Sequence, residues 1–201
     1  MSLNIKVYTD FVCPFCYLGK KVLHDATKEK DVTIEYMPFE LRPIPSPKLD
    51  PWEDSMKVQS WEKFIKPMAN KLQLNMNLPH ISPHPYTNLA FIGYHYAKEN
   101  NKGNEYVDNV FKTFFGEEKD IENTEVLVEV AKSIGLNEEG FRSALKDDKY
   151  KNLQNMALKH SYEEAEISSV PTFVIGDEII YGVTSVEDME AIVDKELAKS
   201  E

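Results

Sequence analysis

The stretch Asp10-Phe11-Val12-Cys13-Pro14-Phe15-Cys16-Tyr17 contains both cysteines of this 201-residue chain. Residues 4–9 alternate before it in a pattern that predicts a strand, and Leu18, Val22 and Ala26 recur after it at helical spacing. A Cys-x-x-Cys pair between a strand and a helix is typical of a thiol-disulfide active site on a βα unit. The sequence therefore predicts redox chemistry at this turn.

The order of residues in the turn assigns a role to each cysteine. With Cys13 as the N-cap, Pro14 falls at the first helical position, where its fixed φ suits helix entry and its missing N–H costs nothing. The free N–H groups and the positive end of the helix dipole favour a thiolate at Cys13. We therefore expect Cys13 to be the nucleophile, with Pro14 and Phe15 shaping the motif. Cys16, one turn along, is placed to resolve a mixed disulfide by attacking Cys13.

Other roles for the cysteines are less well supported. A disulfide across two intervening residues closes a very short loop and would stabilise the fold little. A zinc site is the sharper alternative, because His80 and His84 form an H-x₃-H pair. That pair follows the cysteines by more than sixty residues and lies in a proline-rich loop, whereas zinc fingers place it about a dozen residues on. We therefore predict no metal.

Composition limits the partners. The formal charge is −11, with 23 basic against 34 acidic residues, which argues against nucleic acid and against anionic membranes. No apolar run approaches the ~20 residues that span a bilayer. Because the first strand begins almost at Met1 and the only cysteines are spaced for chemistry, we expect no signal peptide and a cytoplasmic location.

Downstream periodicity predicts two structural regions. Residues 32–36 alternate like a second strand, and residues 42–51 contain four prolines that imply an extended connector. Helical patterns then follow one another to about residue 164, at 53–74 with a bend at Pro67, 86–98, 103–115, 123–134, from Asn137 and at 149–164. In the last helix we expect Leu153, Met156, Ala157 and His160 to point inward.

Strand character returns after this helical region. Ser169-Val170-Pro171-Thr172-Phe173-Val174-Ile175 and residues 178–181 flank Gly176-Asp177, which predicts a hairpin. Ser185-x-x-Asp188 then starts a final helix as a capping box. The expected fold class is α/β, with a sheet domain of residues 1–50 and 165–201 and an inserted all-helical domain of residues 51–164.

This order of elements and motifs resembles the thioredoxin superfamily, and within it the DsbA-like proteins with an inserted helical domain. Residues 10–19, Phe39-Glu40-Leu41 and Val170-Pro171-Thr172-Phe173 look like the FrnE-like group of that family. The resemblance implies a cis proline at Pro171 beside the cysteines. It also implies that the Val170 backbone binds an extended substrate as an added strand. Where family members often have Asn-Thr and Ala-His, this chain has Tyr86-Thr87-Asn88-Leu89-Ala90-Phe91.

The resulting hypothesis is a protein-disulfide oxidoreductase that acts on protein or small thiol and disulfide substrates. Its redox group is the Cys13–Cys16 pair, with no other cofactor and with glutathione as a candidate reductant; the sequence does not indicate an oligomeric state. The first alternative is a glutathione-dependent isomerase or transferase of the kappa-like group, which typically carries serine at the nucleophile position. The second is a non-catalytic binding protein or chaperone with an apolar groove between the domains. Glu40 is expected to be a surface carboxylate outside the site.

Overall fold

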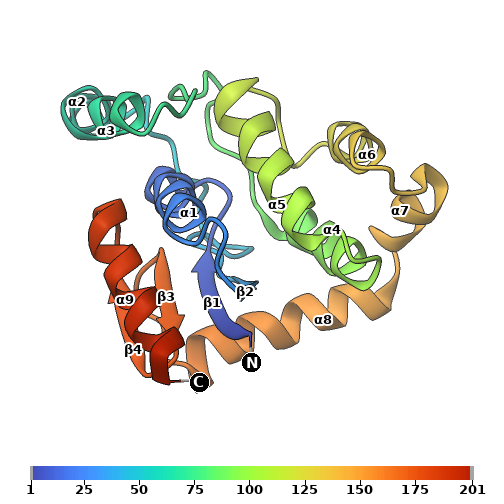
Figure 1. The fold of residues 1–201 in the computed structure, drawn as a ribbon. Coiled ribbons are helices and arrows are strands. Elements are labelled where there is room, and N and C mark those ends of the chain that lie inside the picture. The colour runs from blue at the N-terminus through green and yellow to red at the C-terminus, as the bar shows by residue number, and fades with distance from the viewer. Residues whose placement is uncertain (1, 200–201) are drawn as a thin grey trace.

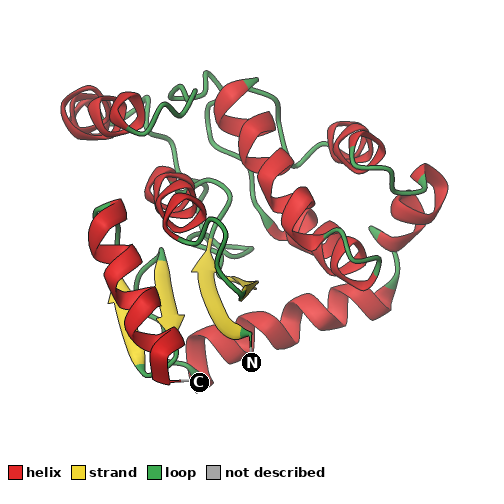
Figure 2. Ribbon diagram, viewed as in Figure 1, coloured by secondary structure: helices red, strands yellow, loops and turns green. Residues whose placement is uncertain are grey.

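The computed structural model describes residues 2–199 and contains one mixed four-stranded sheet in the order β2-β1-β3-β4. The strands are β1 (Leu3–Thr9), β2 (Val32–Pro38), β3 (Thr172–Ile175) and β4 (Glu178–Tyr181). β2 runs parallel to β1, with Ile5 opposite Ile34, whereas β3 runs antiparallel to β1, with Val7 opposite Phe173. The first and last parts of the chain therefore form the sheet together (Figure 2).

All the regular structure between β2 and β3 is helical, as the sequence predicted. The helices and π-helical turns (η) of the chain are α1 (Pro14–Ala26), α2 (Ser55–Ser60), η1 (Trp61–Ile65), α3 (Lys66–Lys71), α4 (Asn88–Glu99), α5 (Gly103–Phe111), η2 (Lys112–Gly116), α6 (Thr124–Ser133), α7 (Glu138–Ala144), α8 (Asp148–Lys159), η3 (His160–Glu164) and α9 (Val186–Lys199). Asn123 and Asn137 cap α6 and α7 through their side chains, which accept the N–H groups of Glu125 and Gly140. No helix within residues 2–199 has both the length and the apolar character to cross a membrane.

Helix α1 lies at the centre of the molecule (Figure 1). On one side it packs beside α9, and both cover the sheet. On the other side the Tyr17 ring stacks on Phe111 and Phe115, with centroids 5.1 and 5.7 Å apart. The aromatic residues of α5 and η2 are fully buried, so the predicted aromatic stripe is core packing. The helix that begins at Cys13 thus contacts both the sheet region and the helical region.

Helix α8 packs against β2 and α4, and its inward face differs from the predicted one. Leu153 and Met156 are exposed, at 37% and 68%, whereas Tyr150 and Gln154 are buried. The apolar periodicity was misleading because Gln154 is held inward by hydrogen bonds. Its amide donates to Glu40 Oε1 at 2.8 Å, and its carbonyl oxygen lies 3.0 Å from His95 Nε2.

Candidate active site

Cys13 occupies the N-cap of α1 with extended backbone angles, φ −88° and ψ 112°, and Pro14 opens the helix. The N–H groups of Cys16 and Tyr17 both point to the Cys13 carbonyl, at 3.1 and 3.3 Å, so the first turn is closed. The strand-to-helix turn is therefore where the sequence placed it. Both cysteines are free thiols in this structure.

The Cys13 thiol faces the segment before β3. Its Sγ donates to the carbonyl oxygen of Val170 at 3.7 Å, and the Val170–Pro171 peptide bond is cis, as the family resemblance implied. Gly19, one turn after Cys16, lets α1 approach this segment closely. A Cβ at Gly19 would lie 2.9 Å from Phe173 Cζ and 3.1 Å from Pro171 Cγ. The structure thus brings Cys13, Cys16, Val170 and Pro171 together.

The residues of the motif differ in exposure. Cys13 is 5% exposed and Cys16 only 1%, whereas the Phe15 ring between them in sequence is 39% exposed. Burial raises the pKa of the Cys16 thiol well above its usual range, and the adjacent Cys13 thiol raises it further. The backbone N–H of Asp10 and the hydroxyl of Thr9 donate to the Cys16 sulfur and partly offset this rise. Cys16 is therefore a thiol at neutral pH, as a resolving cysteine is before it reacts.

Two carboxyl groups lie buried near this turn, and the sequence indicated neither as buried. Asp10 is 1% exposed; burial raises its pKa to about 7, against an opposing hydrogen bond from the Leu41 N–H. Glu40 is 2% exposed, so the prediction of a surface carboxylate is wrong. Burial raises the pKa of Glu40, and the hydrogen bonds that its Oε1 accepts from Asn88 at 2.9 Å and from Gln154 at 2.8 Å partly offset this rise.

A sequence signal for these buried carboxyls existed. Both interrupt short apolar stretches, Asp10 after Thr9 and before Phe11, and Glu40 between Phe39 and Leu41. Periodicity could not identify their hydrogen-bond partners, which lie in other segments: Leu41 and Thr87 for Asp10, and Asn88 and Gln154 for Glu40.

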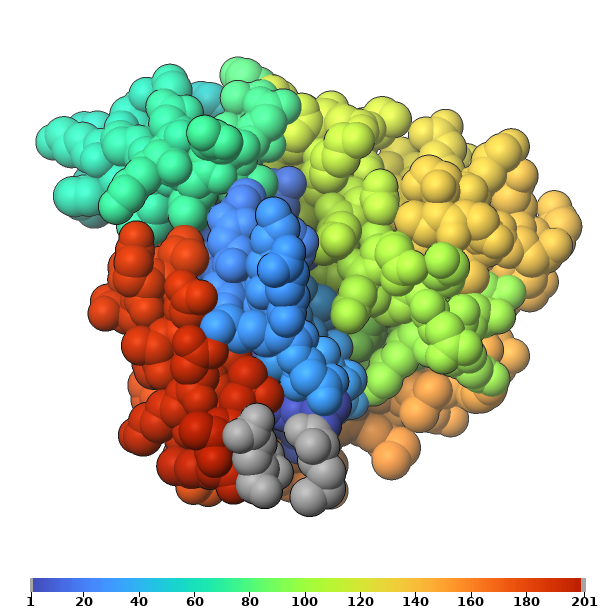
Figure 3. All heavy atoms as spheres, in the orientation of Figure 1, coloured from blue at the N-terminus to red at the C-terminus, as the bar shows by residue number. Residues whose placement is uncertain are grey.

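A cavity of about 780 Å³ lies on the flank of α1, and neither cysteine lines it. Its walls are α1, α3 and the residues that lead into α9, and these elements meet on the face shown in Figure 3. The Gly182 N–H donates to the Pro171 carbonyl at 2.8 Å, which places the neighbouring wall residue Val183 beside the cis proline. The lining is mixed: the apolar residues include Phe64, Met68 and Leu72, and the charged ones are Lys21, Asp25, Lys63, Lys71 and Glu187.

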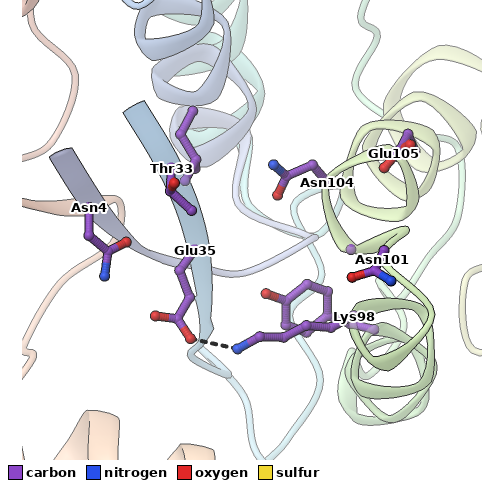
Figure 4. Close-up of a pocket in the computed structure, with 10 residues that line it drawn as sticks. Asn4, Thr33, Glu35, Lys98, Asn101, Asn104 and Glu105 are labelled. Atoms are coloured by element: carbon purple, nitrogen blue, oxygen red, sulfur yellow. Dashed lines mark hydrogen bonds and ion pairs between the residues drawn. The ribbon is translucent and has the colours of Figure 1, made fainter. Parts of the chain in front are cut away.

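A second cavity, of about 490 Å³, lies elsewhere, between the start of β2 and the connection from α4 to α5 (Figure 4). Polar side chains dominate it, including the ion pair between Lys98 and Glu35 at 2.5 Å. Neither cysteine lines it.

The two histidines considered for zinc have other partners. His80 Nδ1 lies 2.7 Å from Glu118 Oε2 and its ring stacks on Trp52, whereas His84 packs edge-on against Phe114. Within residues 2–199 no group of three or more His, Cys, Asp or Glu residues is arranged to hold a metal ion.

Two curated relatives align along most of the chain. An uncharacterized protein, YwbO of Bacillus subtilis strain 168, is 50% identical over 199 residues, covering 99% of this chain and 100% of YwbO. The 2-hydroxychromene-2-carboxylate isomerase of Pseudomonas putida is 25% identical over 183 residues, covering 89% of this chain and 88% of the isomerase.

Solved structures and a family model agree on the fold. A probable DsbA oxidoreductase from Streptomyces coelicolor superimposes with a TM-score of 0.85 at 21% identity, covering 98% of this chain and 91% of that one. The cytosolic disulfide reductase DsbM of Pseudomonas aeruginosa, solved with GSH, gives 0.72 at 13% identity and covers 98% and 100%. The model of the DSBA-like thioredoxin domain matches residues 4–194. The chain therefore belongs to the DSBA-like thioredoxin domain family.

Proposed function

We propose that this protein is a protein-disulfide oxidoreductase in which Cys13 is the nucleophile and Cys16 the resolving cysteine. The observation that carries the proposal is the Cys13 thiol at the N-cap of α1, facing the Val170 carbonyl, with the Cys16 thiol buried beside it. A substrate disulfide is attacked by Cys13 to form a mixed disulfide. Cys16 then attacks Cys13, which releases the substrate thiol and leaves a Cys13–Cys16 disulfide. The same steps run backward in an oxidase.

The surroundings of the pair support roles for the other predicted residues. Pro14 starts the helix and Phe15 presents a partly exposed ring beside the thiols. We propose that the Val170 backbone pairs with an extended substrate while Pro171 holds the turn. We propose that the part of a thiol or disulfide substrate beyond the sulfur extends towards the cavity on the flank of α1, which is lined by apolar and lysine side chains.

The decisive experiment equilibrates the protein with glutathione buffers, traps the thiols and weighs the products. A potential near thioredoxin's, roughly −270 mV, would indicate a reductase, whereas one near roughly −120 mV would indicate an oxidant and argue against a cytoplasmic role. Failure of Cys13 and Cys16 to form a disulfide at any ratio of reduced to oxidised glutathione would refute the proposal. Cys13→Ser and Cys16→Ser provide matched controls, because each removes one partner of the same bond.

A glutathione-dependent isomerase is the second candidate, and the 25% identity to an isomerase favours it. The cysteine pair argues against it, because such an isomerase would have no need of a resolving thiol. Turnover of a small electrophile with glutathione that survives Cys16→Ser would favour this candidate.

We propose further that the protein belongs to the FrnE-like group and acts in the cytoplasm. We also propose that it consists of a sheet domain of residues 1–50 and 165–201 and an inserted helical domain of residues 51–164.

A further inference from the structure

Strand β4 forms a free edge of the sheet (Figure 1), and no strand lies on its outer side within residues 2–199. The Gly182 N–H donates to the Pro171 carbonyl at 2.8 Å, so these two residues are a hydrogen-bonded pair of the ladder between β3 and β4. Such pairs alternate along antiparallel strands, so the backbone groups of Ile180 point to β3 and those of Ile179 and Tyr181 point outward. The N–H and carbonyl groups of two residues are therefore available to another strand.

The same two residues carry the exposed apolar side chains of the edge. Ile179 is 53% exposed and Tyr181 64%, and as alternate residues of a strand they lie on one face of the sheet. Ile180, between them, is opposite Phe173, whose ring packs towards Gly19 of α1. The exposed pair therefore lies on the face turned away from α1, beside the outward backbone groups.

The edge lacks the devices that usually keep edge strands apart. Monomeric proteins protect such strands with lysine, proline or unpaired charges. The only charged residue of β4 is Glu178, and its carboxylate is in an ion pair with Lys195 Nζ at 2.5 Å. The strand is followed by Gly182, which has no side chain to obstruct a neighbour. Neither charge nor bulk therefore opposes the approach of a second strand.

The sequence of β4 is complementary to itself. If two copies pair antiparallel about a two-fold axis at Ile180, Ile179 of each copy lies opposite Tyr181 of the other. Both are outward-facing residues, so each of these two pairs exchanges both of its main-chain hydrogen bonds. Each pair also sets an aromatic ring against a β-branched side chain, which is a favourable cross-strand contact. The same register sets Glu178 opposite Gly182, so like charges do not face each other.

We propose that β4 is a homodimer interface, at which two copies of the chain pair antiparallel in the register centred on Ile180. The two four-stranded sheets then form one continuous sheet, and the contact buries the apolar side chains of Ile179 and Tyr181. Pairing also braces the hairpin whose other strand follows Pro171. The inference is independent of the thiol chemistry, because β4 contains neither cysteine.

Sedimentation equilibrium of the full chain, with a thiol reductant and over a range of protein concentrations, tests the interface. The wild type should show a reversible monomer–dimer equilibrium. Tyr181→Lys removes both aromatic contacts and places a charge on the edge, so we expect the dimer Kd to rise by about tenfold or more. Met156→Lys is the matched control, because Met156 is a similarly exposed apolar residue, at 68%, on α8. Its dimer Kd should stay within about twofold of the wild type.

Disulfide cross-linking tests the register and does not depend on the folding of Tyr181→Lys. In a Cys13→Ser, Cys16→Ser background, Ile179→Cys mixed with Tyr181→Cys should give a disulfide-linked dimer on mild oxidation. The Cα atoms of a hydrogen-bonded pair are about 5.5 Å apart, which a disulfide spans. Each variant alone should cross-link much less, because its two cysteines are not directly opposite.

Three results would overturn the proposal. A wild type that stays monomeric at every concentration would leave the edge to a different partner strand. A dimer that is equally stable in Tyr181→Lys would place the contact elsewhere on the chain. Cross-linking of Ile179→Cys with itself as efficient as in the mixture would refute the register.

Discussion

Replacing Asp10 with Asn should stabilise the folded, reduced protein as the pH rises. The carboxyl is fully buried and has a pKa of about 7 in the fold, against the ordinary value of 3.8. Because the folded pKa is the higher one, the folded state binds more protons between these two values. The contribution of Asp10 to stability is therefore fully present below pH 3.8 and is lost as the pH rises through 7.

The magnitude follows from the shift. A difference of 3.2 pKa units, from 3.8 to about 7, corresponds to a loss of about 4 kcal/mol once the pH exceeds 7. Asparagine does not titrate and so avoids this loss. Whatever constant effect the amide has on packing, the stability of Asp10→Asn relative to the wild type should increase by about 2.5 kcal/mol between pH 5 and pH 8.

Urea denaturation of both proteins with a thiol reductant present, at several pH values from 5 to 8, measures this difference. The two thiols and Glu40 are common to both proteins, so their titrations cancel to first order. A difference in unfolding free energy that stays constant across this range would show that the Asp10 carboxyl does not titrate as its burial demands.

Three further changes test other parts of the structure. Gly19→Ala should cost about 1–3 kcal/mol and slow the attack by Cys13, because the added Cβ would meet Phe173 Cζ at 2.9 Å and Pro171 Cγ at 3.1 Å; a thermal melt with no loss of stability would contradict this. Burial lowers the pKa of His84 to about 4, so its contribution to stability is present above about pH 6.5 and decreases by about 3 kcal/mol as the pH falls to 4. His84→Phe should flatten the pH dependence of urea melts over that interval, and an unchanged slope would refute it. Tyr162→Phe removes a hydroxyl that donates to the Glu40 carbonyl at 2.6 Å, so we expect a loss of about 1 kcal/mol in the same melts, and no loss would show that this bond adds nothing net.

Local patterns in the sequence predicted where several helices begin and where the hairpin turns. Three helices begin at side chains that cap backbone N–H groups no more than three residues away: Asn123, Asn137 and Ser185. Because cap and N–H group are so close in the chain, these helix starts can be recognised in the sequence. The Gly176-Asp177 hairpin and the entry of α1 at Pro14 are equally local. The cis peptide bond before Pro171 could be predicted only from the family resemblance.

The buried polar contacts of Gln154, Glu40 and Asp10 could not be predicted in the same way. Gln154 and Glu40 are 114 positions apart, and their hydrogen bond is what turns α8 away from its apolar face. Helical periodicity assumes that apolar side chains point inward, and it fails where a buried carboxylate needs donors. The burial of Asp10 was missed for the same reason, since its neighbours Leu41 and Thr87 come from distant segments.

The position of α1 between the sheet and the helical region has a consequence for how the molecule can be divided. Tyr17 stacks on Phe111 and Phe115, while Gly19, on the same helix, packs towards Phe173 in β3. Excising the helical region would expose one flank of this helix to water and leave a large apolar surface without a partner. The two regions should therefore unfold in a single cooperative transition, and an evolutionary exchange of the helical region would have to preserve the aromatic contacts of α1.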